Sequence, residues 1–304
     1  MKDFTSPTSR GYRPPPPRFF TVETQDTLLP FLLTHIRDKS RNTVKNLLTA
    51  GCVSVNGKTT TRHDHPLSPG DRVRVGTKEP PELRRVPILY EDDSLLVISK
   101  PAGLLSVATD VERYKTAYRI MTDYVRLNNP DARLFIVHRL DRETSGVLLF
   151  AKTEAMKRAL QDNWNDLVQR REYVALVEGA PERERGVIRT YLHETKTHLV
   201  YSGRSETGVL AVTHYTVLRR GEEYSLLMVD IKTGRKNQIR AHLSELGCPV
   251  AGDKKYGAET NPLGRLALHA TTLELINPLT KRRMTFSSPV PKEFERAFNR
   301  QFHV

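Results

Sequence analysis

A charged segment, residues 138–146, lies between two short apolar runs, 134–137 and 147–151. Each run has the length and composition of a buried β-strand. Because the two predicted strands are so close in the chain, the charged segment between them is expected to form a turn at the edge of a sheet. Such a turn is expected to hold its central acidic residue, Asp141, in a fixed position.

Two arginines, Arg139 and Arg142, flank Asp141. Nearby guanidinium charge favours the ionised form of a carboxylate and lowers its pKa. An anionic carboxylate among cations suits nucleophilic or general-base chemistry on an anionic substrate. A solvated charge cluster of no functional importance is the alternative that the local sequence leaves open.

The overall charge predicts the kind of partner. The 304 residues contain 48 Lys and Arg against 35 Asp and Glu, a net charge of +13. This excess favours a polyanion, nucleic acid before membrane. No apolar run is long enough to span a bilayer, and residues 1–20 lack the apolar segment of a signal peptide. Two distant cysteines, Cys52 and Cys248, predict neither a disulfide framework nor a metal site, and a reducing, cytoplasmic location is the simplest expectation.

Composition divides the chain into four parts. Residues 1–24, with four consecutive prolines and mainly basic charges, are predicted to be a disordered arm. Residues 25–78 are predicted to form a small domain, and the proline-containing segment 79–87 a linker. Residues 88–304 are predicted to form a second, larger domain, which contains Asp141.

The small domain is predicted to contain two helices and a hairpin. Leu29, Leu32, Leu33 and Ile36 recur at helical spacing. Ser40 can cap a second helix that ends at Gly51. Asn56-Gly57 is a strong hairpin-turn signal, and Pro69-Gly70-Asp71 turns the chain into a last strand, 72–75.

Residues 25–78 carry nine basic and four acidic side chains, a net charge of +5. The basic residues Arg37, Lys39, Arg41 and Lys45 are expected on one polar helix face, where Arg37, Arg41 and Lys45 are candidate phosphate contacts. Together with the turn signals, this pattern resembles the S-four-like RNA-binding domain, named after a small-subunit ribosomal protein. The resemblance implies binding of structured RNA.

The remaining chain alternates irregularly between short strands and helices, which predicts an α+β domain with a large, mainly antiparallel mixed sheet. One predicted helix begins near Thr153 and continues through Trp164 to Leu167, with the tryptophan as a packing residue. Another is capped by Asn237 and ended by Gly247.

Missing motifs narrow the chemistry. The chain has no Gly-x-x-x-x-Gly-Lys loop and no Gly-x-Gly-x-x-Gly after a strand, so nucleotide-cofactor binding has no support. It also lacks the His-x-Glu and Cys-x-x-Cys pair of a zinc base deaminase. We therefore expect aspartate chemistry on nucleic acid, with no cofactor and no metal.

Five ordered segments resemble the RNA pseudouridine synthases, in the branch named for the large-ribosomal-subunit enzymes. The segment from His138 to Gly146 resembles the family signature. The other four are Lys100-Pro101-Ala102-Gly103, Arg171-Glu172-Tyr173-Val174-Ala175, Gly234-Arg235 with Gln238-Ile239-Arg240 and His242, and Arg265 with Leu268-His269-Ala270. Two departures are that Lys236-Asn237 precede Gln238 where the family often has a histidine, and that residues 104–107 lack the His-Pro often found there.

The resemblance implies isomerisation of uridine in RNA, in which the bond from ribose to the base nitrogen breaks and the sugar is rejoined at carbon 5 of the base. Asp141 would be the catalytic residue, either attacking the sugar or removing a sugar proton. Arg240 would pair with Asp141, and Tyr173 would stack on the target base and assist proton transfer.

The resemblance also implies contacts with the RNA. Arg139 would enter the RNA where the uridine is flipped out, because a stacked base is out of reach. Leu268 would pack against the base, and Lys100 would support the active-site loop or a phosphate. We expect His138, His242 and His269 to be structural and Glu143 to face solvent.

Ribosomal RNA is the favoured substrate and a monomer the expected state. A tRNA-directed isomerase is one alternative. A non-catalytic RNA-binding factor of ribosome assembly is another.

Overall fold

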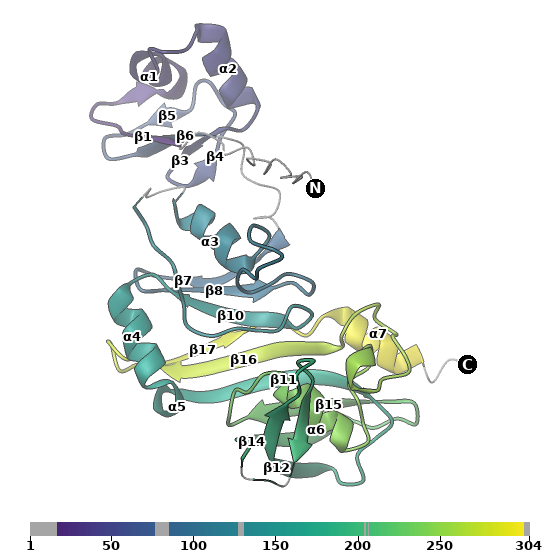
Figure 1. The fold of residues 1–304 in the computed structure, drawn as a ribbon. Helices are drawn as coiled ribbons and strands as arrows, with labels where there is room; N and C mark the ends of the chain where they lie inside the picture. The colour runs from purple at the N-terminus through teal and green to yellow at the C-terminus, as the bar shows by residue number, and fades with distance from the viewer. Residues whose placement is uncertain (1–16, 77–84, 127–130, 204, 206, 301–304) are drawn as a thin grey trace, which may run out of the picture. The chain divides into compact units, whose positions relative to one another are not determined.

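The structure, a computed structural model, describes residues 17–76, 85–126, 131–203, 205 and 207–300. The chain divides into two compact units (Figure 1). The smaller contains Met1–Arg84 with Asp123–Ala132, and the larger contains Arg85–Thr122 with Arg133–Val304. The division after Arg84 falls inside the predicted linker, most of which lies outside the described residues.

The small unit contains two helices and two small antiparallel sheets. Its four-stranded sheet has the order β1-β6-β3-β4, and β2 pairs with β5. Leucine, valine and phenylalanine side chains from both helices and the sheet form one buried core. The elements are β1 (Arg18–Thr21), β2 (Asp26–Thr27), α1 (Leu28–His35), α2 (Arg41–Thr49), β3 (Val53–Val55), β4 (Lys58–Thr59), β5 (Pro66–Leu67) and β6 (Arg72–Val75).

The predicted disordered arm is wrong for its last residues. Strand β1 pairs with β6 from Arg18 opposite Val75 onward, and Val22 is buried. Phe20 packs edge-on against Phe31 of α1, with ring centroids 6.3 Å apart. The aromatic side chains therefore draw this segment into the core, despite the basic, proline-rich composition that precedes it. Residues 1–16 lie outside the described part of the chain.

The local signals in the small unit are confirmed. The Ser40 hydroxyl accepts a hydrogen bond from the Thr43 N–H at 3.2 Å and so caps α2. Gly51 ends that helix in a left-handed conformation. Asn56 and Gly57 both have positive φ, 48° and 80°, as a tight hairpin between β3 and β4 requires.

The predicted basic face is only partly helical. Arg37 and Lys39 lie in the turn between α1 and α2, whereas Arg41 and Lys45 lie on α2. Arg37 and Arg41 are exposed and Lys45 is half-buried.

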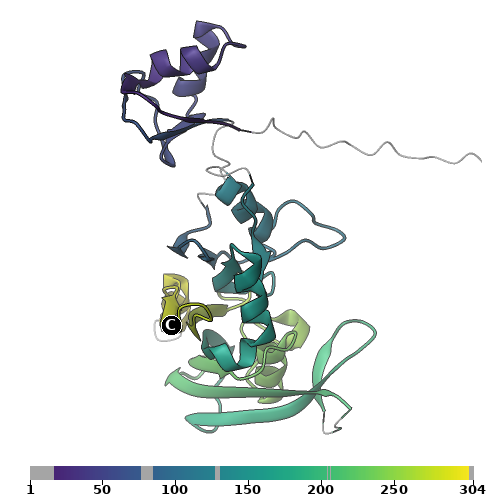
Figure 2. The same cartoon turned by 90° about the vertical axis from the view of Figure 1, so that its left-hand side faces the viewer.

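The larger unit is organised around an eleven-stranded sheet (Figures 1 and 2). Its order is β13-β12-β14-β15-β11-β16-β10-β8-β7, with β17 beside β16 and β9 beside β10. All pairs are antiparallel except β10 with β16, which confirms the predicted mainly antiparallel mixed sheet of an α+β domain. The strands are β7 (Ile88–Glu91), β8 (Leu95–Lys100), β9 (Phe135–Ile136), β10 (Ser145–Ala151), β11 (Val168–Glu178), β12 (Arg185–Glu194), β13 (Val200–Gly203), β14 (Val209–Arg219), β15 (Tyr224–Ile231), β16 (Leu268–Ile276) and β17 (Arg283–Ser287).

The parallel contact between β10 and β16 depends on Gly146. This glycine has φ +112° and lies opposite Ala270. A Cβ atom at position 146 would lie 2.0 Å from the Ala270 carbonyl oxygen. Only glycine combines this backbone conformation with so close an approach.

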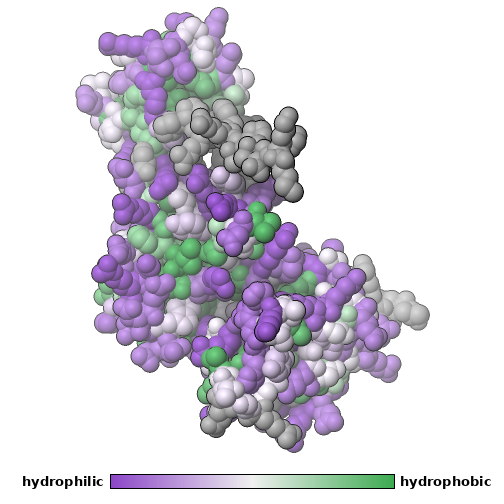
Figure 3. All heavy atoms as spheres, viewed as in Figure 1, coloured by the Kyte–Doolittle hydropathy of each residue, from purple (hydrophilic) through white to green (hydrophobic). Residues whose placement is uncertain are grey.

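Helices cover both faces of β10, so every residue of this strand is buried. Tyr118 of α3 contacts Phe150 on one face, and Met156 and Leu160 of α4 pack against Leu149 on the other. The helices are α3 (Ala117–Arg126), whose last four residues are counted with the smaller unit, α4 (Glu154–Asp162), α5 (Trp164–Leu167), α6 (Gln238–Glu245) and α7 (Lys292–Arg300), with a 3-10 turn, η2 (Lys254–Tyr256). On the face shown in Figure 3, hydrophilic side chains cover most of this unit, with hydrophobic patches between them.

The helix predicted from Thr153 to Leu167 is interrupted. Thr153 caps it as its hydroxyl accepts from the Met156 N–H, but α4 ends at Asp162. Asn163 has the non-helical angles φ −123° and ψ 26°, and its side chain donates to the Ala159 carbonyl. The tryptophan that follows therefore begins a separate short helix.

Among the helices that the structure describes, none is long and apolar enough to cross a membrane.

Candidate active site

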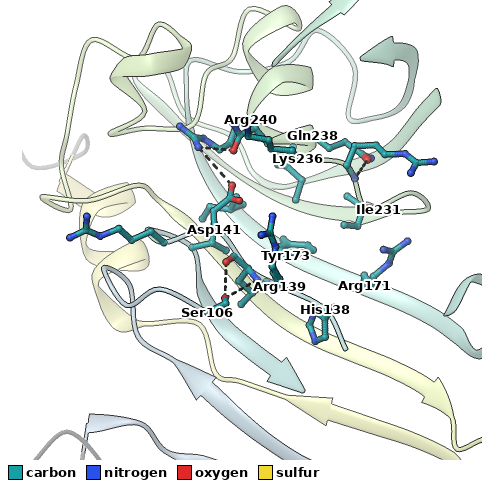
Figure 4. Close-up of a pocket in the computed structure, with 18 of the residues that line it drawn as sticks. Ser106, His138, Arg139, Asp141, Arg171, Tyr173, Ile231, Lys236, Gln238 and Arg240 are labelled. Carbon is teal, nitrogen blue, oxygen red and sulfur yellow. Dashed lines mark hydrogen bonds and ion pairs between the residues drawn. The ribbon is translucent and has the colours of Figure 1, made fainter. Parts of the chain in front are cut away.

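A pocket of about 580 Å³ opens in the larger unit beside the segment 138–146. Its walls come from the loop after β8, from α5 and β11, from the loop before α6, from α6 itself and from the start of β16. Five predicted site residues line it: Arg139, Asp141, Tyr173 and Arg240, which are labelled in Figure 4, and Leu268. Its volume is in the range of small-molecule sites.

Asp141 and Arg240 approach each other in this pocket. The Asp141 Oδ2 atom lies 3.7 Å from the Arg240 Nη1 atom (Figure 4). The Asp141 side chain is 39% exposed and the Arg240 side chain only 16%. The Asp141 carboxylate is therefore accessible to a ligand, whereas the Arg240 guanidinium next to it is largely buried.

Arg240 is held on its other side by Asp253. Its Nε and Nη2 atoms donate to the two Asp253 carboxylate oxygens at 2.6 and 2.7 Å. The guanidinium also lies over the Tyr256 ring, 4.8 Å from its centroid. Burial alone would lower the pKa of Arg240, but the hydrogen bonds and charge of Asp253, together with Asp141 and Tyr256, outweigh burial and raise that pKa. Arg240 therefore stays charged.

Asn237 positions Arg240 rather than capping α6, which corrects the prediction. Its side chain makes no cap hydrogen bond and instead accepts from Arg240 Nη1 at 3.0 Å. Asn237 has the left-handed angles φ 52° and ψ 20°, which asparagine tolerates better than most residues. The Gln238 side-chain oxygen instead binds polar groups of the loop before the helix. It accepts hydrogen bonds from the Arg235 N–H at 3.1 Å and the Thr233 hydroxyl at 2.7 Å.

The loop that carries Asp141 is fixed on both sides of this residue. Before it, the buried Ser106 hydroxyl donates to the Leu140 carbonyl at 2.7 Å and accepts from the Leu140 N–H at 3.1 Å. After it, Lys100 Nζ donates to the Arg142 carbonyl at 3.0 Å. These contacts anchor the loop to the segment that follows β8.

Lys100 supports the loop and does not line the pocket. It is fully buried, and its Nζ also donates to the carbonyls of Pro101 and Leu104. Burial lowers its pKa to about 7, although Glu143 and Asp141 partly offset this. Of the two roles considered for Lys100, a direct phosphate contact is therefore wrong, because nothing outside the protein reaches the buried ammonium.

The two arginines beside Asp141 have different surroundings. Arg142 lies 3.5 Å from Glu143 and donates to the Gly103 carbonyl at 3.1 Å, so it does not pair with Asp141. Arg139 is exposed and lines the pocket. The cation nearest to Asp141 comes instead from α6.

Tyr173 lies on β11 between Asp141 and Arg171 (Figure 4). Burial raises the pKa of its hydroxyl to about 12, with Arg171 opposing and Asp141 adding to this shift. Tyr173 is therefore a neutral phenol at physiological pH, with a proton that it can donate.

The three histidines of the motifs have structural hydrogen bonds. His138 Nε2 accepts from the Leu149 N–H at 3.0 Å. His242 contacts the Thr213 and Thr190 hydroxyls at 2.8 and 3.0 Å, and His269 contacts Ser145 at 2.9 Å and the Ser288 carbonyl at 3.2 Å. Burial lowers the pKa of His138 and of His242 to about 4, so both are neutral.

Sequence reasoning missed several residues of the site. Asp253 and Ser106 hold Arg240 and the Asp141 loop, while Trp164 and Arg171 line the pocket. A signal existed for Arg171, since residues two apart on a strand share a face and Tyr173 was already a candidate. Nothing in the local sequence marked Asp253.

Within the described part of the chain, no group of three or more His, Cys, Asp or Glu side chains could hold a metal ion.

Comparison with known proteins identifies the family. The family described as RNA pseudouridylate synthase matches residues 94–245. The chain is 33% identical over 276 residues to the ribosomal large subunit pseudouridine synthase D of Nitrosomonas europaea, covering 84% of this chain and 78% of that protein. It is 31% identical over 244 residues to the tRNA pseudouridine synthase C of Haemophilus ducreyi, covering 70% of this chain and 94% of that protein.

A comparison with solved structures points to the same family. The human RNA pseudouridylate synthase domain containing 4 superposes with a TM-score of 0.60 at 27% identity, covering 72% of this chain and 94% of that one. The chain belongs to the RNA pseudouridine synthase family. It is an RNA pseudouridine synthase, an isomerase.

Proposed function

We propose that this enzyme converts uridine in ribosomal RNA to pseudouridine, with Asp141 as its catalytic residue. The observation that carries the proposal is the Asp141 carboxylate, open to the pocket and 3.7 Å from the buried guanidinium of Arg240. Both candidate reactions require the carboxylate as an anion, and the adjacent guanidinium supplies a counter-charge. Asp141 either attacks the sugar or removes a sugar proton.

The other pocket residues have distinct roles in this proposal. Tyr173 stacks on the target base and, as a neutral phenol, assists proton transfer. Leu268, only 3% exposed at the start of β16, packs against the base. Arg139, exposed at the pocket, occupies the space that the flipped uridine leaves in the RNA.

Ribosomal RNA is favoured over tRNA as the substrate because more of this chain aligns with the ribosomal relative than with the tRNA relative. The relative named for the large ribosomal subunit aligns with 84% of this chain, whereas the relative named for tRNA aligns with 70%. A tRNA-directed enzyme is the second candidate. Both substrates suit a net charge of +13.

The small unit is proposed to be an S-four-like domain that binds structured RNA. Its two helices, with Arg37 and Arg41 exposed beside Lys45, support a phosphate contact at the start of α2. The only acidic residue in the adjacent turn, Asp38, is paired with Arg18, so it does not neutralise these three. A monomeric state and a cytoplasmic location remain predictions from the sequence.

Mapping pseudouridine across total RNA from cells with and without this protein tests the substrate. A ribosomal uridine that is modified only when the protein is present supports the proposal, and a modified tRNA position alone would transfer it to tRNA. Release of tritium from RNA labelled at uridine carbon 5 measures the reaction in vitro. RNA binding without tritium release from any cellular RNA would instead favour the non-catalytic assembly factor.

A further inference from the structure

Arg171 places a further guanidinium in the active-site pocket, in addition to those of Arg139 and Arg240 and at a distance from Asp141. It lies on β11 two residues before Tyr173 and lines the pocket with it. Figure 4 shows Tyr173 between Arg171 and the pair formed by Asp141 and Arg240. A ligand stacked on Tyr173 would therefore have Asp141 on one side and Arg171 on the other.

The backbone of the loop before α6 fixes the Arg171 guanidinium. Its Nη2 atom donates to the Lys232 carbonyl at 2.7 Å. Its Nη1 atom lies against Gly234, where an added Cβ atom would come within 2.7 Å of it. The guanidinium is thus oriented in advance, with most of its hydrogen-bond donors left for another partner.

Arg171 has no anionic partner among the residues that the structure describes, since no carboxylate oxygen of theirs lies within 4.0 Å of its guanidinium. The nearest candidate, Asp230, accepts from the Arg171 backbone N–H at 3.4 Å and pairs with Lys232 instead. The side chain is nevertheless half-buried. Charges that are withdrawn from water normally have a counter-charge, so this guanidinium is suited to an anion that arrives with the substrate.

We infer that Arg171 binds a phosphate group of the RNA strand that carries the target uridine. The inference rests on the proposed function. The planar fork of a guanidinium matches phosphate oxygens, and RNA supplies one phosphate for every nucleotide. The neighbouring His138 is neutral, so Arg171 rather than this histidine supplies positive charge there. Arg171 would thus hold the RNA backbone beside the flipped uridine and contribute to substrate binding.

The test is Arg171→Gln, with Arg170→Gln as the matched control. Arg170 is exposed and pairs with Glu172 at 3.6 Å, so this control removes the same charge one residue away from the pocket. Binding to unmodified large-subunit ribosomal RNA is measured against salt concentration, in an Asp141→Asn background that leaves the RNA unchanged. Losing one phosphate contact reduces the slope of log K against log salt by about 0.7 to 0.9 and weakens binding about tenfold or more.

The control is expected to leave the slope and affinity nearly unchanged. An unchanged slope for Arg171→Gln, or an equal reduction for Arg170→Gln, would overturn the inference. Single-turnover tritium release by the same arginine variants, with Asp141 intact, separates substrate binding from chemistry. The half-saturating RNA concentration should rise while the maximal rate changes less than threefold, whereas loss of rate alone would indicate a purely structural role.

Gly234→Ala gives a second test, which can be carried out even if the Arg171→Gln variant does not fold. Position 234 has no left-handed backbone, and the new methyl group meets only the guanidinium of Arg171. The substitution should displace the guanidinium, weaken RNA binding, and add nothing further when combined with Arg171→Gln. Additive effects of the two changes would contradict the inference.

The proposed function fails separately, if wild-type protein releases no tritium from any RNA. The salt dependence of binding still tests Arg171 in that case.

Discussion

Arg240 holds Asp253 closely and Asp141 loosely. Its hydrogen bonds to Asp253 are 2.6 and 2.7 Å long, whereas its nearest atom lies 3.7 Å from the Asp141 carboxylate. The guanidinium is therefore anchored from behind, and its position does not depend on Asp141. The Asp141 carboxylate can therefore change its bonding partners while the guanidinium beside it stays in place.

Asp141→Asn should lower the rate of tritium release by at least about a thousandfold, because an amide can neither attack the sugar nor take its proton. RNA affinity should change little, since the side chain keeps its shape. Single-turnover tritium release and filter binding on one preparation measure both quantities. Residual activity near that of the wild type would remove Asp141 from the catalytic role.

Asp253→Asn should leave the buried Arg240 guanidinium without its counter-charge. The asparagine side chain has one acceptor oxygen, so only one of the two hydrogen bonds from Arg240 can remain. We expect the maximal rate to fall about 10- to 100-fold and the free energy of unfolding to fall by about 1–3 kcal/mol, with RNA affinity retained. Denaturant titration and single-turnover kinetics measure these effects. Asp162→Asn, at the exposed end of α4, is the control and should change neither. If Asp253→Asn weakened RNA binding but not the rate, Asp253 would have another role.

Ser106→Ala should loosen the Asp141 loop. The Leu140 N–H, buried with its residue, would lose its acceptor, at a cost of about 1–3 kcal/mol in the free energy of unfolding. A loop that no longer holds Asp141 in one place should also turn over more slowly at saturating RNA. A variant with full rate and lowered stability would show that Ser106 matters for folding alone.

The free energy of unfolding should fall as pH is lowered from 6.5 toward 4. Burial lowers the pKa of His242 from 6.5 to about 4, so between these values the unfolded chain binds the proton that the folded protein excludes. At pH 5 this single group costs about 2 kcal/mol relative to neutral pH. Urea titration at pH 7.5 and pH 5 measures the loss.

His242→Asn, which removes the titrating group, is the comparison for this pH effect. It should be less stable than wild type at pH 7.5, because Thr213 and Thr190 lose a partner, but less sensitive to pH. Equal pH sensitivity in both proteins would mean that other groups dominate.

Replacing Arg37, Arg41 and Lys45 together by glutamine should weaken RNA binding and make it less dependent on salt. If all three contact phosphates, the slope of log K against log salt should fall by about 2 to 3. The maximal rate should stay near that of the wild type, because the pocket lies in the other unit. Lys58→Gln, at an exposed position on β4, is the control for charge loss. An unaltered slope in the triple variant would argue against an RNA-binding role for this face.

Local signals predicted the fold well wherever one short segment determines the structure. The Ser40 cap, the Asn56-Gly57 turn and the buried strand β10 each depend on a few adjacent residues. The prediction was wrong where a more distant contact decided the outcome. Phe20 enters a core formed by α1, and Asn237 adopts a left-handed conformation to meet Arg240 instead of the end of its helix.

The same distinction applies to the site. Of the motif residues that line the pocket, Asp141 was marked both by its charged turn and by the family resemblance, and Arg240 by the resemblance alone. The residues that hold them were not, because Asp253 is 13 positions from Arg240 and Ser106 is 34 positions from Leu140. Supporting contacts of this kind follow from how strands and loops meet in space, which a one-dimensional pattern does not contain. Lys100 illustrates the opposite error, since a lysine in a motif suggests a phosphate ligand until its complete burial is known.

Gly146 limits how this enzyme can diverge. With the Ala270 carbonyl only 2.0 Å from where a side chain would begin, any other residue would force apart the strands that lead to Asp141 on one side and carry Leu268 on the other. In a library that samples every amino acid at every position, codon 146 should retain glycine alone, while neighbouring surface codons accept many replacements. The geometry of the site therefore depends on the lack of a Cβ atom at position 146. Changes in substrate preference are expected at residues on the rim of the pocket instead.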